Sequence, residues 1–289
     1  MPRGRIVKAY AGFYYVKEND QLWECRLRGK YRFRKEDFLV GDEVEFQVTG
    51  AGTGVIEARR PRQSELRRPL VANVEQAVLV MAIVKPRADL LLLDRLLIQS
   101  THAGLTPAIV FNKVDLDPEA AEPLGKTYLP GKYLVLITSA KARIGIDKLA
   151  GIIQGRISVL AGPSGVGKSS LINALQPGLR LKSAAVSEKV ERGRHTTRHV
   201  ELLEVAGGLV CDTPGFSKLD LPEIGPQELA SYFPEMEAFL GQCRFNSCLH
   251  NREPGCAVKA AVETGSIPLS RYQNYVRFLE ELIERERRY

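Results

Sequence analysis

The chain has 289 residues, 44% of them hydrophobic, which is enough for two or three domains with packed interiors. It contains no apolar run of about eighteen residues and begins without an apolar secretory core, so we expect a cytoplasmic protein that does not cross a membrane. Its formal net charge of +7 favours a polyanionic partner, nucleic acid above all, although a basic soluble enzyme could carry the same charge.

Residues 1–68 are expected to form a small basic barrel. Four short segments rich in β-branched and aromatic residues are separated by turn residues, at 5–18, 21–29, 41–50 and 52–60. Closely spaced strands of this kind are typical of a barrel of the oligonucleotide-binding (OB) type. Because the segment carries fifteen Lys and Arg against ten Asp and Glu, we predict that it binds RNA.

One stretch of this barrel alternates aromatic residues with cations. Tyr31 and Phe33 interleave with cations, an arrangement that suits stacking on bases beside phosphate contacts. These cations are Arg28, Lys30, Arg32 and Arg34. The same alternation is expected of a strand that buries its aromatic face and exposes its arginines. The sequence leaves both interpretations open.

The middle segment, with expected bounds 69–220, alternates apolar runs with amphipathic stretches. It begins after a polar, proline-bounded stretch that marks a domain boundary. A helix is predicted from Leu90 to Gly104. Five apolar runs are interpreted as buried parallel strands, at 76–84, 106–115, 132–140, 157–165 and 207–215. This alternation predicts an α/β sheet wound by right-handed crossovers.

The second of these strands leads into Asn112-Lys113-Val114-Asp115, which matches the N-K-x-D pattern of guanine-nucleotide proteins. A carboxylate such as Asp115 can accept from both N1–H and the N2 amino group of guanine, whereas adenine would leave that charge unpaired. Asn112 can brace the loop and contact the base, and Lys113 can lie over the ring. We therefore predict a guanine-binding loop here.

A supporting loop for the base is predicted at 138–141, after the next strand. The backbone N–H of Ala140 is expected to meet guanine O6, with Ser139 and Lys141 beside it in the same loop. By itself the Ser139-Ala140 pair would indicate a polar turn and no more. The preceding N-K-x-D pattern is what favours a role in base recognition.

Residues 162–169 match the pattern G-x-x-x-x-G-K-[ST] and stand between an apolar strand and a helix, the context of a phosphate-binding loop. Glycines let backbone N–H groups turn towards phosphate oxygens, and the helix adds its positive end. Lys168 supplies a cation for the β- and γ-phosphates, and the Ser169 hydroxyl suits Mg²⁺. The residues expected to bind nucleotide here are Gly162, Pro163, Ser164, Gly165, Val166, Gly167, Lys168, Ser169 and Ser170.

The motif at 212–215 follows another strand. Asp212 can hold a Mg²⁺-bound water, and Gly215 can present its N–H to the γ-phosphate. The base-binding loop thus precedes the phosphate loop, the reverse of the usual order, and a closed fold tolerates such a circular permutation because its termini often lie close together. We hypothesise that nucleotide state moves the adjoining C-terminal domain relative to the barrel.

The segment 191–199 lies where a switch segment is expected. Phe216 occupies the place at which small GTPases commonly carry a glutamine that orients the attacking water. His195 is the leading candidate to replace it, and Arg194 and His199 are weaker ones. Thr197, or its neighbour Thr196, can ligate Mg²⁺ when the γ-phosphate is present.

Residues 221–289 lose the strand pattern and are expected to form a helical zinc-binding domain. Three thiolates and one imidazole suit a closed, tetrahedral, structural Zn²⁺ site, although free thiols beside a surface histidine are the alternative. These ligands are Cys243, Cys248, His250 and Cys256. The last helix is predicted to begin at a Ser270 cap and to pack through Leu269, Tyr272, Val276, Leu279 and Ile283.

Together these motifs resemble the ribosome small-subunit-dependent GTPase A (RsgA) family of circularly permuted GTPases, and the resemblance covers nearly the whole chain. It implies an N-terminal OB-type β-barrel, a central α/β P-loop GTPase domain and a C-terminal helical zinc-binding domain. It also implies that GTP hydrolysis to GDP is stimulated by the small ribosomal subunit during late maturation of that subunit, with contacts to its rRNA. In the family the histidine that matches His195 is the catalytic group, and the threonine that matches Thr197 is the switch threonine. We expect a monomer.

Two other functions remain open. An RNA-binding scaffold whose GTP turnover is incidental is motivated by Phe216. An ATP-using kinase could be built on the same phosphate loop, but Asp115 argues against it.

Overall fold

The computed structural model describes residues 1–29, 38–67, 69–179, 200–211 and 220–288. The aromatic–cation alternation around Tyr31 and Phe33 lies outside these ranges, so neither interpretation of it is tested. Among the described residues, no helix combines the length and the apolar character needed to span a bilayer.

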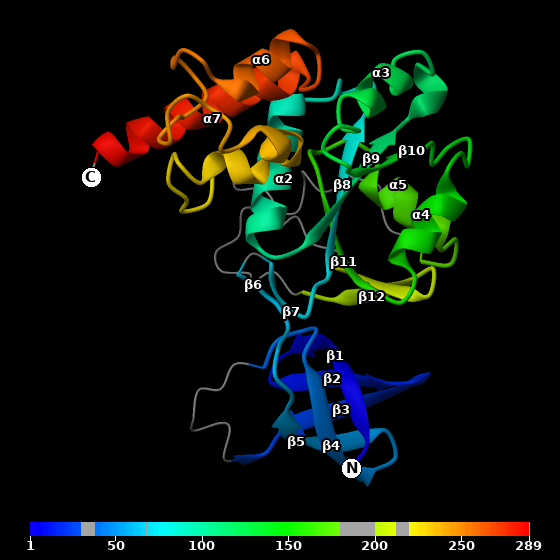
Figure 1. Cartoon of the computed structure of the whole chain (residues 1–289). Coiled ribbons are helices and arrows are strands. Elements are labelled where there is room, and N and C mark those ends of the chain that lie inside the picture. The colour runs from blue at the N-terminus through cyan, green and yellow to red at the C-terminus, as the bar shows by residue number, and fades with distance from the viewer. Residues whose placement is uncertain (30–37, 68, 180–199, 212–219, 289) are drawn as a thin grey trace.

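The N-terminal strands close into the predicted barrel (Figure 1). Neighbouring strands of the barrel are hydrogen-bonded in the order β1-β2-β3-β5-β4. Every second residue points inward along them, so that Ile6, Val16 and Phe46 are fully buried. The strand bounds are β1 (Arg3–Tyr10), β2 (Phe13–Glu18), β3 (Gln21–Leu27), β4 (Glu43–Gly50) and β5 (Thr53–Arg59).

The boundary stretch after the barrel is bonded to it and is not a free linker. The hairpin of β6 (Glu65–Arg67) and β7 (Leu70–Ala72) follows Arg62, whose guanidinium binds both oxygens of the buried Asp42 at 2.7 and 2.9 Å. Gly41 touches β7 so closely that an added Cβ would lie 2.0 Å from the Ala72 carbonyl oxygen. The barrel is therefore joined firmly to the chain that enters the next domain.

The middle domain is a six-stranded sheet in the order β10-β9-β8-β11-β13-β12. The five predicted strands are present and parallel, whereas the antiparallel edge strand β12 was not predicted, because it is only four residues long. The strand bounds are β8 (Gln76–Ala82), β9 (Thr106–Asn112), β10 (Leu134–Ile137), β11 (Ile157–Ala161), β12 (Leu202–Val205) and β13 (Gly208–Cys211).

Helices cover both faces of this sheet. Alternate residues of β8 enter two separate cores, with Leu79 and Met81 on one side and Val78 and Val80 on the other. The first face carries α2 (Leu90–His102) and α3 (Ala121–Lys126), and the second carries α4 (Ile146–Ile153) and α5 (Lys168–Leu175). The predicted α/β sheet of buried parallel strands is confirmed, and the structure shows that helices cover both of its faces.

The C-terminal domain contains short 3₁₀ and α-helices that pack around one long helix and against α2 (Figure 1). Their bounds are η3 (Leu229–Tyr232), η4 (Pro234–Phe239), α6 (Ala257–Glu263) and α7 (Leu269–Arg287). Ile98 of α2 belongs to the same apolar core as Phe233 and Phe278. The domain therefore shares its interior with the middle domain.

The predicted face of α7 is confirmed in part. Leu279 is buried, and Tyr272, Val276 and Ile283 pack against the same core. Leu269 is 59% exposed, and the inner face also contains the buried polar residues Arg271 and Asn274. Ser270 is not the cap either, because the helix begins at Leu269 after Pro268, without a side-chain cap. The polar residues that turn inward do so because they meet buried partners from other elements.

Those partners form a buried ion-pair cluster between α7, α2 and η4. The guanidinium of Arg271 donates to both oxygens of Glu235, at 2.6 and 3.2 Å. Its Nη1 lies 2.5 Å from Asp94 Oδ1 without hydrogen-bond geometry. Asp94 also accepts from Tyr128 at 2.8 Å and from Asn274 at 2.7 Å. The cluster fastens the C-terminal domain to α2.

The barrel meets the middle domain at β12. Lys8 on β1 pairs with Glu201 at 3.4 Å, and Lys17 on β2 pairs with Glu204. A backbone bridge also joins Lys8 to Glu201. All four side chains are partly exposed, so these ion pairs are much less buried than the pairs between α2 and α7. The apolar core itself is continuous from the barrel to the sheet.

Candidate nucleotide-binding site and metal centre

The nucleotide motifs meet at the carboxyl ends of neighbouring parallel strands. Asn112 is the last residue of β9, and the loop at 162–167 connects β11 to α5. Residues 138–141 follow β10. Because β8, β9, β10 and β11 are parallel, their ends lie at one edge of the sheet, where ligands of such folds bind.

The side-chain amide of Asn112 links three loops. Its Nδ2 donates to the Val166 carbonyl of the phosphate loop at 2.9 Å. Its Oδ1 accepts from Ala140 N at 3.2 Å and from Thr138 Oγ1 at 3.3 Å. The side chain is buried, so these bonds have no competition from water. The base loop, the supporting loop and the phosphate loop are therefore adjacent, despite their reversed order in the chain.

Lys113 makes a second bridge to the phosphate loop. Its ammonium donates to the carbonyl of Gly165 at 2.6 Å and to that of Lys85. The residue has φ of 67°, a left-handed conformation that turns the chain from β9 into the loop. Burial lowers the pKa of Lys113, against the opposing charge of Asp115. The aliphatic part of Lys113 consequently lies between the base loop and the phosphate loop.

The carboxylate of Asp115 is held by the supporting loop. Ser139 Oγ donates to Asp115 Oδ1 at 2.5 Å and accepts from Ala142 N at 2.9 Å. Ser139 is fully buried, so the predicted polar turn is part of the site's framework. This arrangement orients a carboxylate at the sheet edge beside the N–H of Ala140.

The phosphate loop has the backbone that its glycines predict. Gly162, Gly165 and Gly167 have φ of 140°, 79° and 99°. A Cβ on Gly162 would lie 2.0 Å from the Val80 carbonyl oxygen, and one on Gly167 would lie 2.4 Å from the Asn112 amide nitrogen. The Lys168 ammonium donates to the carbonyls of Gly162 and Pro163 at 2.7 and 2.9 Å. Ser164 lies in this loop, and Ser169 and Ser170 lie in the first turn of α5.

An open cavity of about 460 Å³ lies between the supporting loop and α5. Its lining brings Lys141 together with Ser170, two residues that the motifs predict to bind the nucleotide. Arg143 also lines it and donates to the Ala174 carbonyl at 3.2 Å. No sequence motif predicted a role for Arg143. Its left-handed φ of 56° was not predictable either, because arginine seldom adopts this backbone conformation.

The four predicted metal ligands converge. The donor atoms of Cys243, Cys248, His250 and Cys256 all lie within 4.8 Å of one another. His250 Nδ1 is 3.4 Å from the Cys243 sulfur and 3.5 Å from the Cys256 sulfur. Burial lowers the pKa of His250, against the opposing charge of Glu253, and so favours the neutral imidazole that binds metals. Three thiol sulfurs and one imidazole fit a tetrahedral zinc ion.

Side chains of α7 and an acidic residue hold the loop around this cluster. Tyr272 and Tyr275 donate to the carbonyls of His250 and Leu249, each at 2.9 Å. The Glu253 carboxylate accepts from the backbone N–H groups of Leu249 and Asn251 at 2.9 and 3.0 Å. The metal loop is therefore bonded directly to the helix that carries Arg271.

Two family models match this chain. The RsgA N-terminal domain model matches residues 3–56, and the RsgA GTPase model matches residues 58–222. The chain belongs to the RsgA GTPase family. Its enzyme class is accordingly that of a GTP hydrolase, as the motifs predict.

Curated relatives are similar in sequence to this chain over nearly its full length. A protein of Moorella thermoacetica named small ribosomal subunit biogenesis GTPase RsgA is 53% identical over 285 residues, which is 98% of each chain. A protein of the same name from Geobacillus kaustophilus is 50% identical over 293 residues and covers 100% of each chain.

Solved structures of this RsgA fold are also similar. YjeQ from Thermotoga maritima is 39% identical, has a TM-score of 0.85 and covers 98% of each chain. YloQ, described as a circularly permuted GTPase, is 40% identical with a TM-score of 0.80, covering 99% of this chain and 96% of its own. The predicted circular permutation is confirmed by this likeness and by the strand order.

Several predicted site residues lie outside the described ranges. They are the candidate water-positioning residue His195 with its alternatives Arg194 and His199, the Mg²⁺ ligand Thr197, the motif residues Asp212 and Gly215, and Phe216. Their roles stay predictions from sequence. The segment that contains Asp212, Gly215 and Phe216 lies between Cys211 and Asp220, the nearest described residues on either side.

Proposed function

We propose that this RsgA-family GTPase assists the late maturation of the small ribosomal subunit, binds it as a monomer, and hydrolyses GTP faster when bound to it. One observation carries the nucleotide part of this proposal. The Asn112 amide joins the base loop to the phosphate loop and to the supporting loop. Residues from three separate stretches of the chain can therefore bind the base and the phosphates of a single guanine nucleotide.

Guanine is recognised by Asp115 and Ala140. The Asp115 carboxylate accepts from N1–H and the N2 amino group of guanine. The Ala140 N–H, which donates to Asn112 Oδ1 in this structure, exchanges that partner for O6 when guanine is bound. Ser139 keeps the carboxylate oriented through its 2.5 Å bond, and Lys113 covers one face of the ring. Adenine presents no donors to Asp115, so ATP would bind far more weakly.

The phosphates are held by backbone N–H groups of residues 164–169 and by the Lys168 ammonium. The Lys168 ammonium exchanges its carbonyl partners for the β- and γ-phosphates, which form stronger, charge-assisted bonds. Ser169 and Thr197 are the residues that would hold Mg²⁺, with Asp212 holding a bound water. When bound there, the ion would supply positive charge beside the phosphate oxygens on which negative charge develops. Gly215 donates its N–H to the γ-phosphate.

The attacking water is oriented by His195 in this proposal, because Phe216 cannot do so. The cysteine–histidine cluster would hold one structural zinc through Cys243, Cys248, His250 and Cys256. A closed set of four such donors stabilises a fold and leaves no position for a substrate. We assign the zinc to the architecture of the C-terminal domain.

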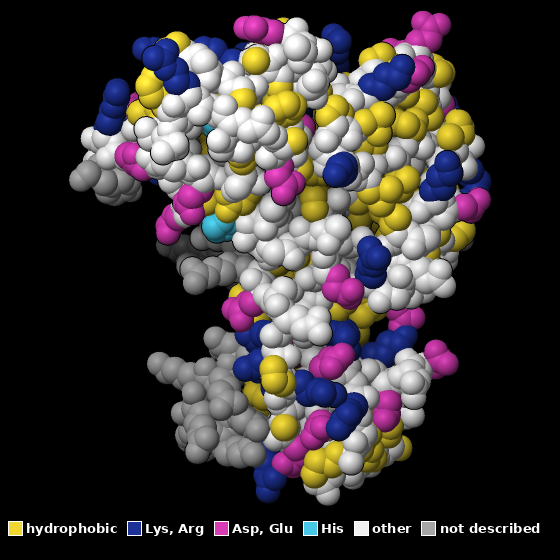
Figure 2. Space-filling view, viewed as in Figure 1, with side chains coloured by type: hydrophobic (Ala, Val, Ile, Leu, Met, Phe, Trp, Pro, Cys, Tyr) yellow, Lys and Arg dark blue, Asp and Glu magenta, His cyan; other side chains and the backbone are white. Residues whose placement is uncertain are grey.

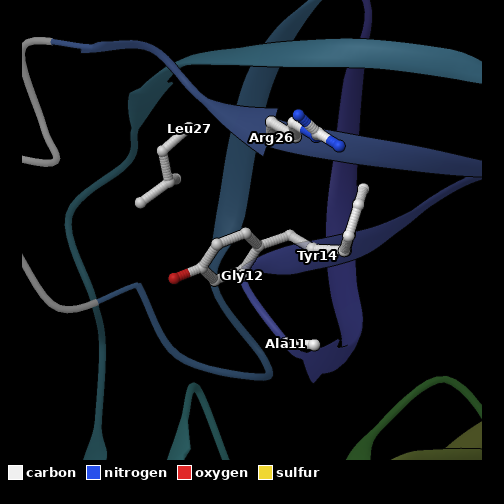
Figure 3. A pocket seen from close by; sticks show the side chains of 6 residues that line it. Ala11, Gly12, Tyr14, Arg26 and Leu27 are labelled. Atoms are coloured by element: carbon white, nitrogen blue, oxygen red, sulfur yellow. The ribbon is translucent and has the colours of Figure 1, made fainter.

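Contact with rRNA is assigned first to the barrel. Figure 2 shows Lys and Arg side chains on the barrel, with acidic side chains between them, especially near the middle domain. A cavity of about 340 Å³ on the barrel is lined by Tyr14, Arg26 and Leu27 (Figure 3). The Arg26 guanidinium lies 4.5 Å from the centre of the Phe13 ring, which also lines the cavity. An aromatic ring beside a cation suits an unstacked base.

The decisive experiment measures GTP hydrolysis with and without purified small ribosomal subunits, for the wild-type chain and for His195→Ala. We expect the subunits to raise wild-type turnover, and His195→Ala to bind GTP normally but to lose about a hundredfold or more of the stimulated rate. Unchanged turnover in the variant would remove His195 from the mechanism. No stimulation of the wild type at any salt concentration would favour the RNA-binding scaffold, and a preference for ATP in the binding assay would favour the kinase.

A further inference from the structure

The side chain of Arg143 ties the supporting loop to the helix that follows the phosphate loop. Its Nη1 donates to the carbonyl of Ala174, near the C-terminal end of α5, at 3.2 Å in a partly buried position. Both residues line the open cavity of about 460 Å³ that Lys141 and Ser170 also line. The sequence motifs assign Lys141 and Ser170 to the nucleotide. Arg143 therefore lies beside the expected nucleotide, although it belongs to no motif.

The supporting loop is a closed turn that is fixed to the sheet at its base. Ser139 and Ile144 exchange two backbone hydrogen bonds, of 2.9 and 3.0 Å. Gly145 has φ of 68° and lies so close to the end of β10 that an added Cβ would be 2.3 Å from the Ile137 carbonyl oxygen. Residues 140–143 lie between these fixed points, and the Arg143 side chain joins them to α5.

The backbone of Arg143 indicates that its side chain, and not the turn, explains this residue. Its φ of 56° is left-handed, a conformation that a residue with a Cβ seldom adopts. Glycine would adopt it without strain. The turn by itself would therefore be served better by glycine, and the feature that arginine adds is a guanidinium bound to α5.

Binding of the base makes this tie important. In this structure the Ala140 N–H donates to Asn112 Oδ1 at 3.2 Å, and in the proposed function it leaves that oxygen for guanine O6. The exchange removes one of the contacts that hold the loop beside the base site. The bond from Arg143 to α5 does not take part in the exchange, so it can keep the Ala140 N–H within reach of O6.

We infer that Arg143 is a positioning residue for guanine recognition, whose guanidinium holds the supporting loop against α5 so that the Ala140 N–H meets O6. This inference rests on the proposed function, in which Ala140 contacts the base. The base is the same in GTP, in GDP and in the transition state. An interaction made equally in all of them contributes to binding and not to the chemical step. Arg143 therefore sets the affinity for the nucleotide and not kcat.

The test measures the affinities of the full chain for GDP and for 6-thio-GDP, without ribosomal subunits, in the wild type, Arg143→Ala and Arg143→Gly. We expect the affinity for GDP to fall about fivefold in both variants, as for the loss of one hydrogen bond. The affinity for 6-thio-GDP should fall by less than about twofold, because sulfur is a weak acceptor for the Ala140 N–H. Since glycine accepts the left-handed backbone, a loss in Arg143→Gly belongs to the guanidinium.

Two further readouts separate positioning from a general loosening of the fold. Arg143→Lys keeps a donor and should recover part of the affinity for GDP. In steady-state hydrolysis of GTP by Arg143→Ala, KM should rise about fivefold while kcat stays within about twofold.

Lys148→Ala is the matched control, because Lys148 is an exposed cation on the neighbouring helix α4. It should leave both affinities unchanged. Wild-type affinity for GDP in both Arg143→Ala and Arg143→Gly would overturn the inference. So would an equal loss of GDP and 6-thio-GDP, or a fall in kcat at unchanged KM. A wild type that does not prefer GDP to ADP would instead count against the base recognition of the proposed function.

Discussion

At the scale of single residues, Asn112 explains how a permuted site stays intact. Its amide offers a donor and an acceptor on one rigid plane, so it can bind Val166 on one side and Ala140 on the other. Gly167 has no side chain because a Cβ there would meet this amide at 2.4 Å. The N-K-x-D and phosphate-loop patterns are coupled by this contact, whichever of them comes first in the chain.

Asp115→Asn should change the base that the site prefers. An asparagine amide donates to the 2-oxo group of xanthine, whereas it loses the paired acceptors that guanine needs, so GTP affinity should fall about a hundredfold and XTP should become the better substrate. Hydrolysis of GTP and XTP in competition measures this. Glu119→Gln, in the same loop but exposed, should keep the preference for GTP. Continued preference for GTP in the Asp115 variant would contradict its role.

At the scale of elements, the junction between α2 and α7 depends on one buried cation. Arg271 lies between Glu235 and Asp94, with its guanidinium 4.6 Å from the ring centre of Phe233. Burial raises the pKa of Asp94, against the opposing Arg271 charge and the bonds from Asn274 and Tyr128. Buried charges are tolerated here because each has partners, which is also why this polar face of α7 turns inward.

Arg271→Met should destabilise the protein by about 3–5 kcal/mol at neutral pH, because two buried carboxylates lose their cation. Removing that charge raises the pKa of Asp94 further. A group whose pKa is raised by folding favours the folded state at low pH and loses this contribution as pH rises through the folded-state pKa. The deficit should therefore be smaller at pH 5 than at pH 8.

Urea denaturation at both pH values checks this prediction. Arg288→Met, at an exposed ion pair on the same helix, should change the unfolding free energy by no more than about 0.5 kcal/mol. If Arg271→Met loses more unfolding free energy at pH 5 than at pH 8, the charge of the buried carboxylates is not what destabilises this variant.

At the scale of the whole molecule, the flanking domains are attached in different ways. The C-terminal domain shares a core and a buried ion-pair cluster with α2. The barrel shares an apolar core with the sheet, to which Ile6 and Leu79 both belong, and adds the partly exposed pairs of Lys8 and Lys17. Exposed pairs contribute little and exchange readily with other ions, so the ionic part of the attachment is stronger on the C-terminal side.

Metal removal should propagate through this architecture. The metal loop is bonded to α7 by Tyr272 and Tyr275, and α7 carries Arg271. We expect about one zinc per chain, and chelation should lower the thermal midpoint by at least about 5 °C. Zinc should restore it. Cys25→Ala, in the barrel core, should keep the metal, and a chain without zinc by metal analysis would end the assignment.

Short consecutive patterns were enough to predict the barrel, the doubly covered sheet, the nucleotide motifs and the metal ligands. Each of these depends on neighbouring residues, on glycines with left-handed φ or on strand-length apolar runs, all visible in the linear chain. The buried polar residues of α7, the short edge strand β12 and the contacts of Gln99 and Arg285 with the backbone carbonyls of 220–222 were not predictable. The polar residues of α7 and α2 face inward or bind backbone because partners far away in the chain satisfy them, and the folded chain alone brings those partners together. Strand β12 is defined by its pairing with β13.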